Sequence, residues 1–589
     1  MVDERATAAM RIAAVIWCVV LVFGAGPSLA ASPDVKVDQV GYLPNEPKLA
    51  MVTSGAVSSG AARAPFVVRR GSDDAVVFSG VLGGAQDDAD HSGDVVRWAN
   101  FTKLKERGTF YLQVEGVGTS HPFVIADNTY RRTFYTVMRS FYGQRCGTAV
   151  DLGPTRPAYS HPACHTADGV FHLCSAGRSG TRAATRGWHD AGDYGKYVVN
   201  SGITTGTLLL AYERYADRLK AVSLDVPESG DGTPDVLDEI RWNLGWMLAM
   251  QDEDGGVFHK LTRESFSGFV MPQDDHATRF LVGTGGSPFK GSCATADFAA
   301  VMAIAARVYQ PFDAGFAATC RGAAERAWTW LTARPNVTYD NNCGIVTGAY
   351  GDADCSDERL WAAAELFRTT GRGRYGAFFA ARYGAYSPTV RPEWPQGWQN
   401  VQNLAMWSYQ ASPGARPAVR DVIRRDTVAA ADAIVERSQS NPYRHSIRPE
   451  EYVWGSSGMV ANYAVLLLVA NDVEADPRYA HTALDNLHYL FGRNAHGVSF
   501  VTGVGASSVR NPHHRPSAGD GVAAPWPGLV IGGPNRYDAD GSGLDDLPAT
   551  PPMRRWVDET ASYASNENAI NWNAPLVYAL ASTLPGDLP

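Results

Sequence analysis

The stretch Asp235–Gln251, DVLDEIRWNLGWMLAMQ, sets the fold class of the larger part of the chain. Its apolar side chains recur every three or four residues, at Val236, Ile240, Leu244, Met247 and Leu248. This spacing places them on one face of an α-helix, which predicts a helix that buries that face.

Similar patterns predict about twelve helices after residue 127. Their expected ranges are 128–147, 201–219, 235–251, 294–310, 316–335, 357–371, 373–386, 400–410, 421–439, 456–473, 478–496 and 567–582. The helices do not alternate with strands, so we expect an all-α toroid, in which six helical hairpins close into an (α/α)6 barrel. An open helical solenoid is the alternative, and the lack of a fixed-period repeat argues against it.

Residues 35–126 follow a different pattern. Seven short β-branched runs are separated by Gly, Pro, Asn or Asp, namely VKVDQVGYL, KLAMVTSG, PFVVRR, AVVFSGVL, VVRWANFT, GTFYLQVEG and HPFVIA. Such runs predict an immunoglobulin-like β-sandwich, with a looser all-β cap as the alternative. We expect the boundary between the sandwich and the helical part at Asp127–Asn128.

Composition and charge exclude several classes of protein. The chain has 589 residues, 45% of them hydrophobic and 19% charged, so it is neither one small domain nor a disordered chain. Its 52 Lys and Arg stand against 61 Asp and Glu, a net charge of −9. A nucleic-acid binder usually carries a basic surplus, so we expect no nucleic-acid partner.

The N-terminus resembles an export signal. Arg5 and Arg11 precede an apolar run, 12–25, and small residues follow it at Ser28 and Ala30. This pattern predicts a signal peptide over residues 1–30 and a secreted product. The run is short for a membrane span, although an uncleaved anchor remains the alternative. After cleavage we expect a monomer without membrane contact.

Seven cysteines follow the predicted signal peptide: Cys146, Cys164, Cys174, Cys293, Cys320, Cys343 and Cys355. An odd number cannot all pair, which suggests a metal site or a free thiol beside one or two disulfides. Cys343 and Cys355 flank a short polar loop, and we predict that they pair.

The first candidate site is GWHDAGDYGKY, residues 187–197. Asp190 and Asp193 stand three residues apart among glycines, a spacing that puts them on one side of a helical turn. Two such carboxylates can hold one water, one as its base and the other to orient it. An Asx-turn or a cation site is the alternative.

The second candidate site is WVDETASYASNENAINWNAP, residues 556–575. Ser565 is predicted to cap the following helix, with Glu567 in its first turn, where the helix dipole alone favours a carboxylate. The neighbouring asparagines and tryptophan, however, indicate support for a site; they are Asn566, Asn571, Trp572 and Asn573.

The third candidate site combines SFVTGVG, residues 499–505, with RNPHHR, residues 510–515. His and Arg on a loop can donate hydrogen bonds to sugar hydroxyls or orient a carboxylate. A basic surface turn is the alternative.

Together these stretches resemble glycoside hydrolase family 9, the inverting cellulases, over residues 128–584. The second block matches the family's aromatic-x-Asp, aromatic, Glu and Asn-Ala pattern at Trp556, Asp558, Tyr563, Glu567, Ala569, Asn573 and Ala574. The third block matches Thr-x-x-Gly … Pro-His-x-Arg, except that Ser507 stands where Asn, Lys or Arg is usual. DQVGYLP, residues 38–44, resembles the immunoglobulin-like domain that precedes some members.

The resemblance implies a role for each matching residue. Asp193 would be the general base, Asp190 would help to hold the water, and Glu567 would be the general acid. The cleavage subsite would be lined by Asp558, His513 and Arg515. Inversion requires the acid and base carboxyls to stand roughly 6.5–9.5 Å apart, and the two pKa values should be split, with the acid raised.

A mixed thiolate and imidazole set predicts a structural Zn²⁺ site at Cys146, Cys164, His165 and His189. Four such ligands suit a closed tetrahedral site, and some members of the family carry one with this pattern. A disulfide between Cys146 and Cys164 is the alternative.

Asp354, Asp357 and Glu358 resemble a structural Ca²⁺ site of the family, and clustered carboxylates suit that ion. Helix capping by these residues is the alternative. No organic cofactor is expected. Loop aromatics are candidates for stacking on sugar rings, namely Trp188, Trp398, Tyr452 and Trp454.

The prediction is therefore a secreted inverting endo-β-1,4-glucanase acting on cellulose or related β-glucans. An exo-acting cellobiohydrolase or β-glucosaminidase on the same scaffold is the alternative within the class. A non-catalytic carbohydrate-binding protein is the alternative from another class. It would lack one of the carboxylates, whereas Asp190, Asp193 and Glu567 are all present.

Overall fold

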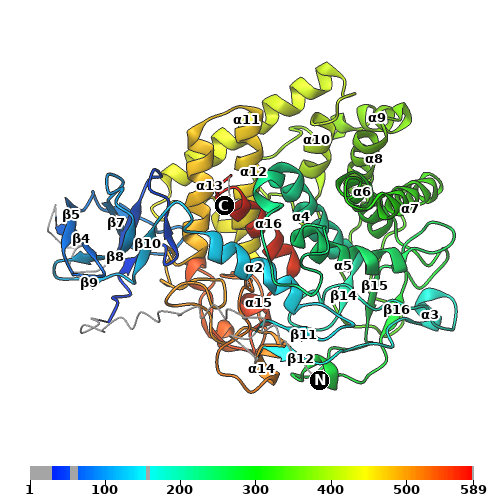
Figure 1. The fold of residues 1–589 in the computed structure, drawn as a ribbon, viewed down its shortest axis with the longest axis horizontal. Helices are drawn as coiled ribbons and strands as arrows, with labels where there is room; N and C mark the ends of the chain where they lie inside the picture. The colour runs from blue at the N-terminus through cyan, green and yellow to red at the C-terminus, as the bar shows by residue number, and fades with distance from the viewer. Residues whose placement is uncertain (1–29, 54–63, 154–158, 587–589) are drawn as a thin grey trace, which may run out of the picture.

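Two bodies of different architecture lie side by side in the computed structural model, which describes residues 30–53, 64–153 and 159–586. Figure 1 shows a small β-sheet body, in blue, against one side of a large helical body. The predicted signal peptide, except for Ala30, lies outside the described residues. The expected order, an immunoglobulin-like sandwich followed by an all-α barrel, is confirmed.

The N-terminal body consists of two sheets. One has the strand order β1-β3-β7-β6, and the other β2-β10-β8-β4-β5, with β9 paired to β8. The strands are β1 (Val35–Lys36), β2 (Gly41–Tyr42), β3 (Leu49–Val52), β4 (Pro65–Arg70), β5 (Val76–Val81), β6 (Gln86–Asp87), β7 (Val95–Asn100), β8 (Gly108–Val114), β9 (Gly118–Thr119) and β10 (Phe123–Ile125). Alternate residues of β4 and β8 are buried between the sheets, among them Phe66, Val68, Phe110 and Leu112.

The first predicted run, VKVDQVGYL, forms two strands in different sheets. Asp38 lies between them, and its Oδ1 accepts hydrogen bonds from the backbone N–H groups of Val40, at 2.7 Å, and Gly41, at 3.0 Å. This turn carries the chain from one sheet to the other. Gly41 has a φ of +134°, and a Cβ there would lie 1.9 Å from the carbonyl oxygen of Val124, so only glycine fits.

The helical body contains a counterpart of each of the twelve predicted helices. They are α2 (Arg131–Gly143), α4 (Val198–Leu219), α5 (Asp235–Met250), α6 (Ser292–Val308), α7 (Ala314–Ala333), α8 (Ser356–Thr370), α9 (Gly373–Ala380), α10 (Gln402–Gln410), α11 (Pro417–Ser440), α12 (Ser456–Val473), α13 (Pro477–Leu490) and α16 (Ile570–Ala581). Neighbouring pairs α12·α16, α16·α4, α4·α6, α6·α8 and α8·α10 trace an inner ring, which the remaining helices cover from outside.

One inner helix is apolar enough to resemble a membrane span. Helix α12 has a mean hydropathy of 1.2 over 18 residues, and 72% of that window is buried. Its neighbours in the barrel cover it, so burial in a protein core accounts for its composition.

Short strands in the helical body were not predicted. A four-stranded sheet has the order β13-β16-β15-β14, with β13 (Val170–Phe171), β14 (Lys196–Tyr197), β15 (Lys260–Thr262) and β16 (Phe280–Val282). Strands of two or three residues are too short to show a period in the sequence. Strand β14 leads directly into α4 and supports the loop that carries Asp193.

The predicted disulfide between Cys343 and Cys355 is wrong. Cys174 pairs with Cys343, and Cys293 pairs with Cys355. Cys355 lies at the start of α8, and Cys293 lies in the first turn of the neighbouring helix α6, so the partner on the adjacent helix is paired in place of the partner along the loop. Among the described residues, three cysteines remain unpaired, namely Cys146, Cys164 and Cys320.

The sandwich and the barrel share an interface that is both polar and apolar. The Nδ1 atom of His488 in α13 lies 2.7 Å from Oδ2 of Asp38, and the indole N–H of Trp98 donates to the carbonyl of Pro442 over 2.7 Å. Met51 of the sandwich is fully buried in the same apolar core as the barrel helices. The sandwich therefore covers apolar surface of the barrel.

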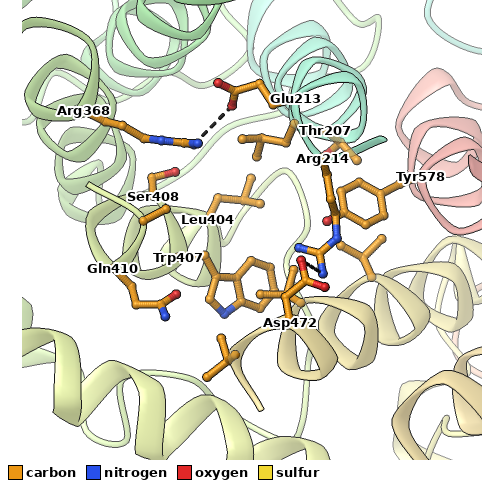
Figure 2. Close-up of a pocket in the computed structure, with 15 residues that line it drawn as sticks. Thr207, Glu213, Arg214, Arg368, Leu404, Trp407, Ser408, Gln410, Asp472 and Tyr578 are labelled. Carbon is orange, nitrogen blue, oxygen red and sulfur yellow. Dashed lines mark hydrogen bonds and ion pairs between the residues drawn. The ribbon is translucent and has the colours of Figure 1, made fainter. Parts of the chain in front are cut away.

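The barrel contains a cavity at the end opposite the predicted catalytic residues. The C-terminal parts of α4, α8, α10 and α12 line a cavity of about 330 Å³, which Figure 2 shows. Two ion pairs form part of the cavity lining, one between Arg368 and Glu213 and one between Arg214 and Asp472. Asp193 and Glu567 both lie just before the N-terminal ends of inner helices, so the candidate site is at the other end.

Candidate active site

The loop before α4 holds both aspartates of the first candidate site in fixed positions. Asp190 accepts hydrogen bonds on both oxygens, from the amide of Asn200 on Oδ1 and from the Tyr350 hydroxyl on Oδ2, the latter over 2.7 Å. Oδ2 of Asp193 accepts from the backbone N–H of Gly195 at 3.1 Å. Both aspartates are buried.

The two aspartates differ in whether they leave a carboxylate oxygen without a hydrogen bond. Both oxygens of Asp190 are bonded to protein groups, whereas Oδ1 of Asp193 accepts no hydrogen bond from the described residues. Burial, and then the charge of Asp193, raises the pKa of Asp190 to about 7. The arrangement suits Asp193 as the group that takes a proton and Asp190 as the group that orients.

Glu567 lies in a short extended segment rather than in the first turn of a helix. It follows α15 (Tyr563–Asn566) and precedes α16, with φ −75° and ψ 151°. The predicted position is therefore wrong, because the helix expected from residue 567 begins at Ile570. The segment is held by hydrogen bonds from Gly532 N to Glu567 O, at 2.7 Å, and from Ile570 N to Asp190 O, at 2.9 Å.

The surroundings of Glu567 favour a protonated carboxyl. Its Oε1 atom accepts a hydrogen bond from the backbone N–H of Gly192 at 3.3 Å. Burial, and then the negative charge of Asp193, raises the pKa of Glu567 well above its ordinary value, and the guanidinium of Arg515 opposes this shift in part. A carboxyl that stays protonated near neutral pH can act as a general acid.

The loop 510–515 is anchored by Asp558. The carboxylate of Asp558 accepts from the backbone N–H groups of Arg510 and Asn511, each over 2.8 Å, and from the amide of Asn566 over 3.2 Å. Asp558 therefore positions the loop, and its oxygens are occupied by protein groups. The resemblance had implied that it lines the cleavage subsite.

His513 and Arg515 lie beside the two segments that carry the candidate carboxyls. Nδ1 of His513 lies 2.7 Å from the carbonyl oxygen of Thr560, which keeps the proton on Nδ1 when the ring is neutral. The backbone N–H of Arg515 donates to the carbonyl of Gly192 over 3.0 Å. A Cβ at Gly192 would lie 1.9 Å from the carbonyl oxygen of His513, so the two loops pack backbone to backbone.

Two of the four predicted stacking aromatics are in the core. Trp188 is fully buried, with its indole N–H donating to Glu239 over 2.8 Å. Tyr452 is fully buried, with its hydroxyl 3.2 Å from Nδ1 of His91 in the sandwich. No face of either ring is left for a sugar, so this prediction is wrong for both.

The other two predicted aromatics remain candidates for the cleft. The Trp398 ring is edge-on to Tyr350 at 5.1 Å, and the Trp454 ring is 43% exposed and lies 5.3 Å from Tyr563. Tyr350 itself was missed in the sequence analysis. It lies 160 positions from Asp190, and only the closed barrel brings them together.

The predicted zinc ligands converge. One donor atom from each of four residues lies within 4.8 Å of all the others, namely Cys146, Cys164, His165 and His189. It is the one such group of His, Cys, Asp and Glu found in the described residues. Cys146 and Cys164 do not form the alternative disulfide.

Neighbouring charges suit two thiolates and two neutral imidazoles. Cys146 Sγ lies 3.4 Å from the ammonium of Lys196 and 3.5 Å from the guanidinium of Arg279. Nε2 of His165 lies 3.4 Å from the carboxylate of Asp275, which leaves Nδ1 to face Nε2 of His189, at 3.3 Å. Carboxylate partners of this kind orient metal-binding histidines.

The three predicted calcium ligands do not form one site. Asp354 is exposed, and its carboxylate accepts from the N–H and the hydroxyl of Ser356, as in an Asx-turn that precedes the helix. Glu358 is fully buried, and neither of its oxygens has a hydrogen-bond partner in the described part of the chain. The same holds for both oxygens of Asp297, which the sequence analysis did not select and whose negative charge helps to raise the pKa of Glu358.

Comparisons with known proteins agree with this geometry. Residues 130–580 match the model of "Glycosyl hydrolase family 9", and residues 30–119 match that of the "Cellulase N-terminal ig-like domain". Endoglucanase D of Acetivibrio thermocellus is 38% identical over 551 residues, which cover 93% of this chain and 83% of that protein. A xyloglucan-specific endo-beta-1,4-glucanase of Bacteroides ovatus is 34% identical over 586 residues, covering 95% of each.

Solved structures show the same arrangement. The crystal structure of a metagenome-derived family 9 endoglucanase has a TM-score of 0.87 and 36% identity, covering 93% of this chain and 98% of that one. A Zn-binding triple mutant of the family 9 endoglucanase J30 has a TM-score of 0.85 and 34% identity, covering 93% and 100%. Since a family model spans most of the chain and relatives above 30% identity span nearly all of it, the chain is a glycoside hydrolase that belongs to glycosyl hydrolase family 9.

Proposed function

We propose that this chain is a secreted endo-β-1,4-glucanase that hydrolyses cellulose or a related β-glucan with inversion at the anomeric carbon. The observation that carries the proposal is the contact between Gly192 N and Glu567 Oε1, which joins the Asp193 loop to an acid with a raised pKa. The proposed proton acceptor, Asp193, thus follows directly on the residue that contacts the proposed proton donor, and inversion requires such a pair.

Each of the three carboxyl groups has a separate role in the reaction. Asp190, held by Asn200 and Tyr350, orients a water, and Oδ1 of Asp193 takes a proton from it as the oxygen attacks the anomeric carbon. Glu567 gives its proton to the glycosidic oxygen as that carbon–oxygen bond breaks. The reaction leaves Asp193 protonated and Glu567 ionised, and proton exchange with solvent restores both groups.

The relatives support action on β-1,4-glucans. Several are named endoglucanases, and others are named cellodextrinase and cellulose 1,4-beta-cellobiosidase, at 32% and 31% identity. Exo action therefore remains the second candidate. Viscosity of a soluble cellulose derivative separates the two, because an endo-acting enzyme lowers it early, at a low yield of reducing ends.

Proton NMR of cellopentaose hydrolysis tests the mechanism directly. We expect the α-anomer as the first product, followed by mutarotation. An initial β-anomer would contradict the pairing of Asp193 as base with Glu567 as acid. Absence of hydrolysis on cellulose, mixed-linkage glucan, xyloglucan and chitosan oligomers would contradict the proposed substrate class.

Export as a monomer is part of the proposal. It rests on the apolar run at 12–25 with the small residues after it, and on two disulfides, which persist in oxidising compartments. Gel filtration of the purified protein and N-terminal sequencing of the exported form test these two points.

We further propose structural metal sites. Zn²⁺ fits Cys146, Cys164, His165 and His189, and would cross-link the start of the loop that carries Asp190, with no part in the proton transfers. Ca²⁺ is proposed at the unpartnered buried oxygens of Glu358 and Asp297, which are a pair of carboxylates and not a converging set of three, and Asp354 is left out. Metal analysis of the purified protein, with and without chelator, tests both.

A further inference from the structure

Two buried side chains hold a loop beside the candidate active site by its backbone. Nζ of Lys260, the first residue of β15, donates to the carbonyl oxygens of Thr347, over 3.1 Å, and Gly348, over 2.8 Å. Nε2 of His259, just before β15, lies 2.7 Å from the carbonyl oxygen of Ala349. A carbonyl oxygen can only accept, so this ring nitrogen carries the proton. Three consecutive carbonyl groups are thus bound by two consecutive side chains.

Tyr350 comes directly after these carbonyl groups. Its φ is +45°, in the left-handed region that residues other than glycine seldom adopt. Such a conformation persists where the surrounding structure fixes the backbone. The Tyr350 hydroxyl donates to Oδ2 of Asp190 over 2.7 Å, so the backbone at residue 350 decides where that donor lies.

The strand that holds this loop also supports the loop of the two aspartates. Strand β15 pairs antiparallel with β14, with Lys260 opposite Tyr197. Strand β14 follows shortly after Asp193 in the chain. Both partners of the hydrogen bond between Asp190 and Tyr350 are therefore connected to one strand, β15, which links them across a long distance in the sequence.

Lys260 also places a positive charge near the candidate base. The titratable groups around it are, in chain order, Asp193, Tyr197, His259 and Tyr339. Burial lowers the pKa of Lys260 to about 7, and the negative charge of Asp193 opposes this shift. The attraction acts on both partners, so an ammonium at Lys260 favours the carboxylate form of Asp193.

We propose that Lys260 and His259 are positioning residues for the hydrolysis, which fix residues 347–349 so that the Tyr350 hydroxyl holds Asp190 in place. The two side chains are 0% and 2% exposed and bind backbone groups, so they act through their neighbours and do not touch the substrate. The proposal rests on the proposed function, because that function assigns roles to Asp190 and Asp193. A purely structural role would instead lower stability and leave catalysis by the folded enzyme unchanged.

Kinetics of K260M and H259L on cellopentaose tests the proposal. Methionine is about as long as lysine and lacks the ammonium, and leucine lacks the Nε2–H donor. We expect kcat to fall at least about tenfold in each variant, because small displacements of catalytic groups slow the reaction strongly. KM should change less than about threefold, because no substrate contact is removed.

The two variants should differ in pH dependence. K260M removes a positive charge, so the acidic limb of its pH–kcat profile should move to higher pH by about one unit. H259L removes no charge, and its limb should stay in place. H259Q should recover most of the wild-type kcat, because the glutamine amide can donate to the carbonyl of Ala349 as the ring does.

Lys48 provides a matched control for the loss of a buried ammonium. It is fully buried in the sandwich, and its Nζ also donates to backbone carbonyls, namely those of Leu43, Pro44 and Glu46. K48M should lower the melting temperature as K260M does. Below that temperature it should keep the wild-type kcat and the wild-type acidic limb.

The outcomes separate this proposal from the proposed function. A folded K260M with wild-type kcat and an unmoved acidic limb would overturn the role of Lys260, and wild-type kcat in H259L would overturn that of His259. If K260M does not fold, the comparison of H259L with H259Q decides whether the bound carbonyl groups matter for kcat. In each case hydrolysis by the wild type would leave the proposed function standing, whereas a wild-type enzyme inactive on every β-glucan would refute it.

Discussion

The backbone N–H of Gly192 donates a hydrogen bond to Oε1 of Glu567 over 3.3 Å, although the two residues are 375 positions apart. This bond joins the loop before the first inner helix of the barrel to the segment before the last. Because those helices, α4 and α16, are neighbours in the ring, the two segments that carry the proposed base and acid lie side by side.

Removal of either proposed catalytic carboxyl should greatly slow turnover without unfolding the protein. We expect D193A and E567Q each to lower kcat at least about 100-fold, the smaller end of what positioned acids and bases contribute. Release of reducing sugar and circular dichroism are the measurements. Glu474 is an exposed carboxylate remote from the cleft, so E474Q should keep full activity. Wild-type kcat in E567Q would remove Glu567 from the mechanism.

Activity should persist above the ordinary pKa of glutamate. The acid must be protonated to act, and its raised pKa keeps it protonated as pH rises past 4.5. We therefore expect the alkaline limb of the pH–kcat/KM profile to lie well above that value. In D193N the charge that helps to raise the Glu567 pKa is gone, and its ¹³C-carboxyl titration should move to lower pH. A limb centred near pH 4.5 in the wild type would contradict the assignment.

Loss of the proposed zinc ligands should remove one metal ion and loosen the loop that carries Asp190 and Asp193. We expect one Zn²⁺ per chain by atomic absorption, and none in C164S/H189A. The melting temperature should fall by at least about 5 °C, since an ion that binds only the folded state stabilises it. C320S, which changes a buried cysteine outside the set, should retain the zinc. Full zinc content in C164S/H189A would place the ion elsewhere.

Asp252 should stabilise the folded state at neutral pH, and protonation of its carboxylate in acid should remove this contribution. Burial alone would raise its pKa, but hydrogen bonds from Arg178, Lys290 and Arg182 outweigh burial and hold the pKa well below the usual range. Its contribution is therefore present above pH 3.8 and is lost as pH falls below that value. D252N should cost about 3–5 kcal/mol at neutral pH, and the difference in melting temperature should shrink in acid.

Asp217 is the matched control for Asp252. Its side chain is 90% exposed, and its one ion pair within the described part of the chain is with Lys220. D217N should therefore change the melting temperature very little at any pH. A difference between wild type and D252N that stays constant from pH 7 to pH 2.5 would show that the ion pairs are not its source.

The sandwich should stabilise the barrel as part of one cooperative unit. Met51 is fully buried in the core that both bodies share, so M51A should cost about 2–5 kcal/mol. Calorimetry should show a single transition, shifted down, with activity lost along it. Val81 lies on the outer face of the sandwich and is 55% exposed, and V81A should have little effect. Two separate transitions, with barrel activity unaffected, would contradict the role as a brace.

Features carried by local pattern were predicted from the sequence. Apolar spacing in helices such as Asp235–Met250 depends only on neighbours three and four positions away, and twelve helices were expected correctly for this reason. The proposed zinc ligands were also predicted, because adjacent cysteines and histidines outside a disulfide pattern are typical of a metal site. The two-residue strand β14 left no such trace, and neither did the extended conformation of Glu567.

Features that depend on distant residues were settled only by the closed barrel. Cys343 lies 169 positions from its partner Cys174, and Tyr350 lies 160 positions from Asp190, separations over which no local pattern operates. Trp188 faces the core because Glu239 accepts a hydrogen bond from its indole N–H, and Glu239 is distant in the sequence. Chain-local periodicity therefore predicted the elements, and the resemblance to family motifs indicated the candidate carboxyls. Long-range packing determined their partners, their exposure and their protonation, because these depend on residues far apart in the chain.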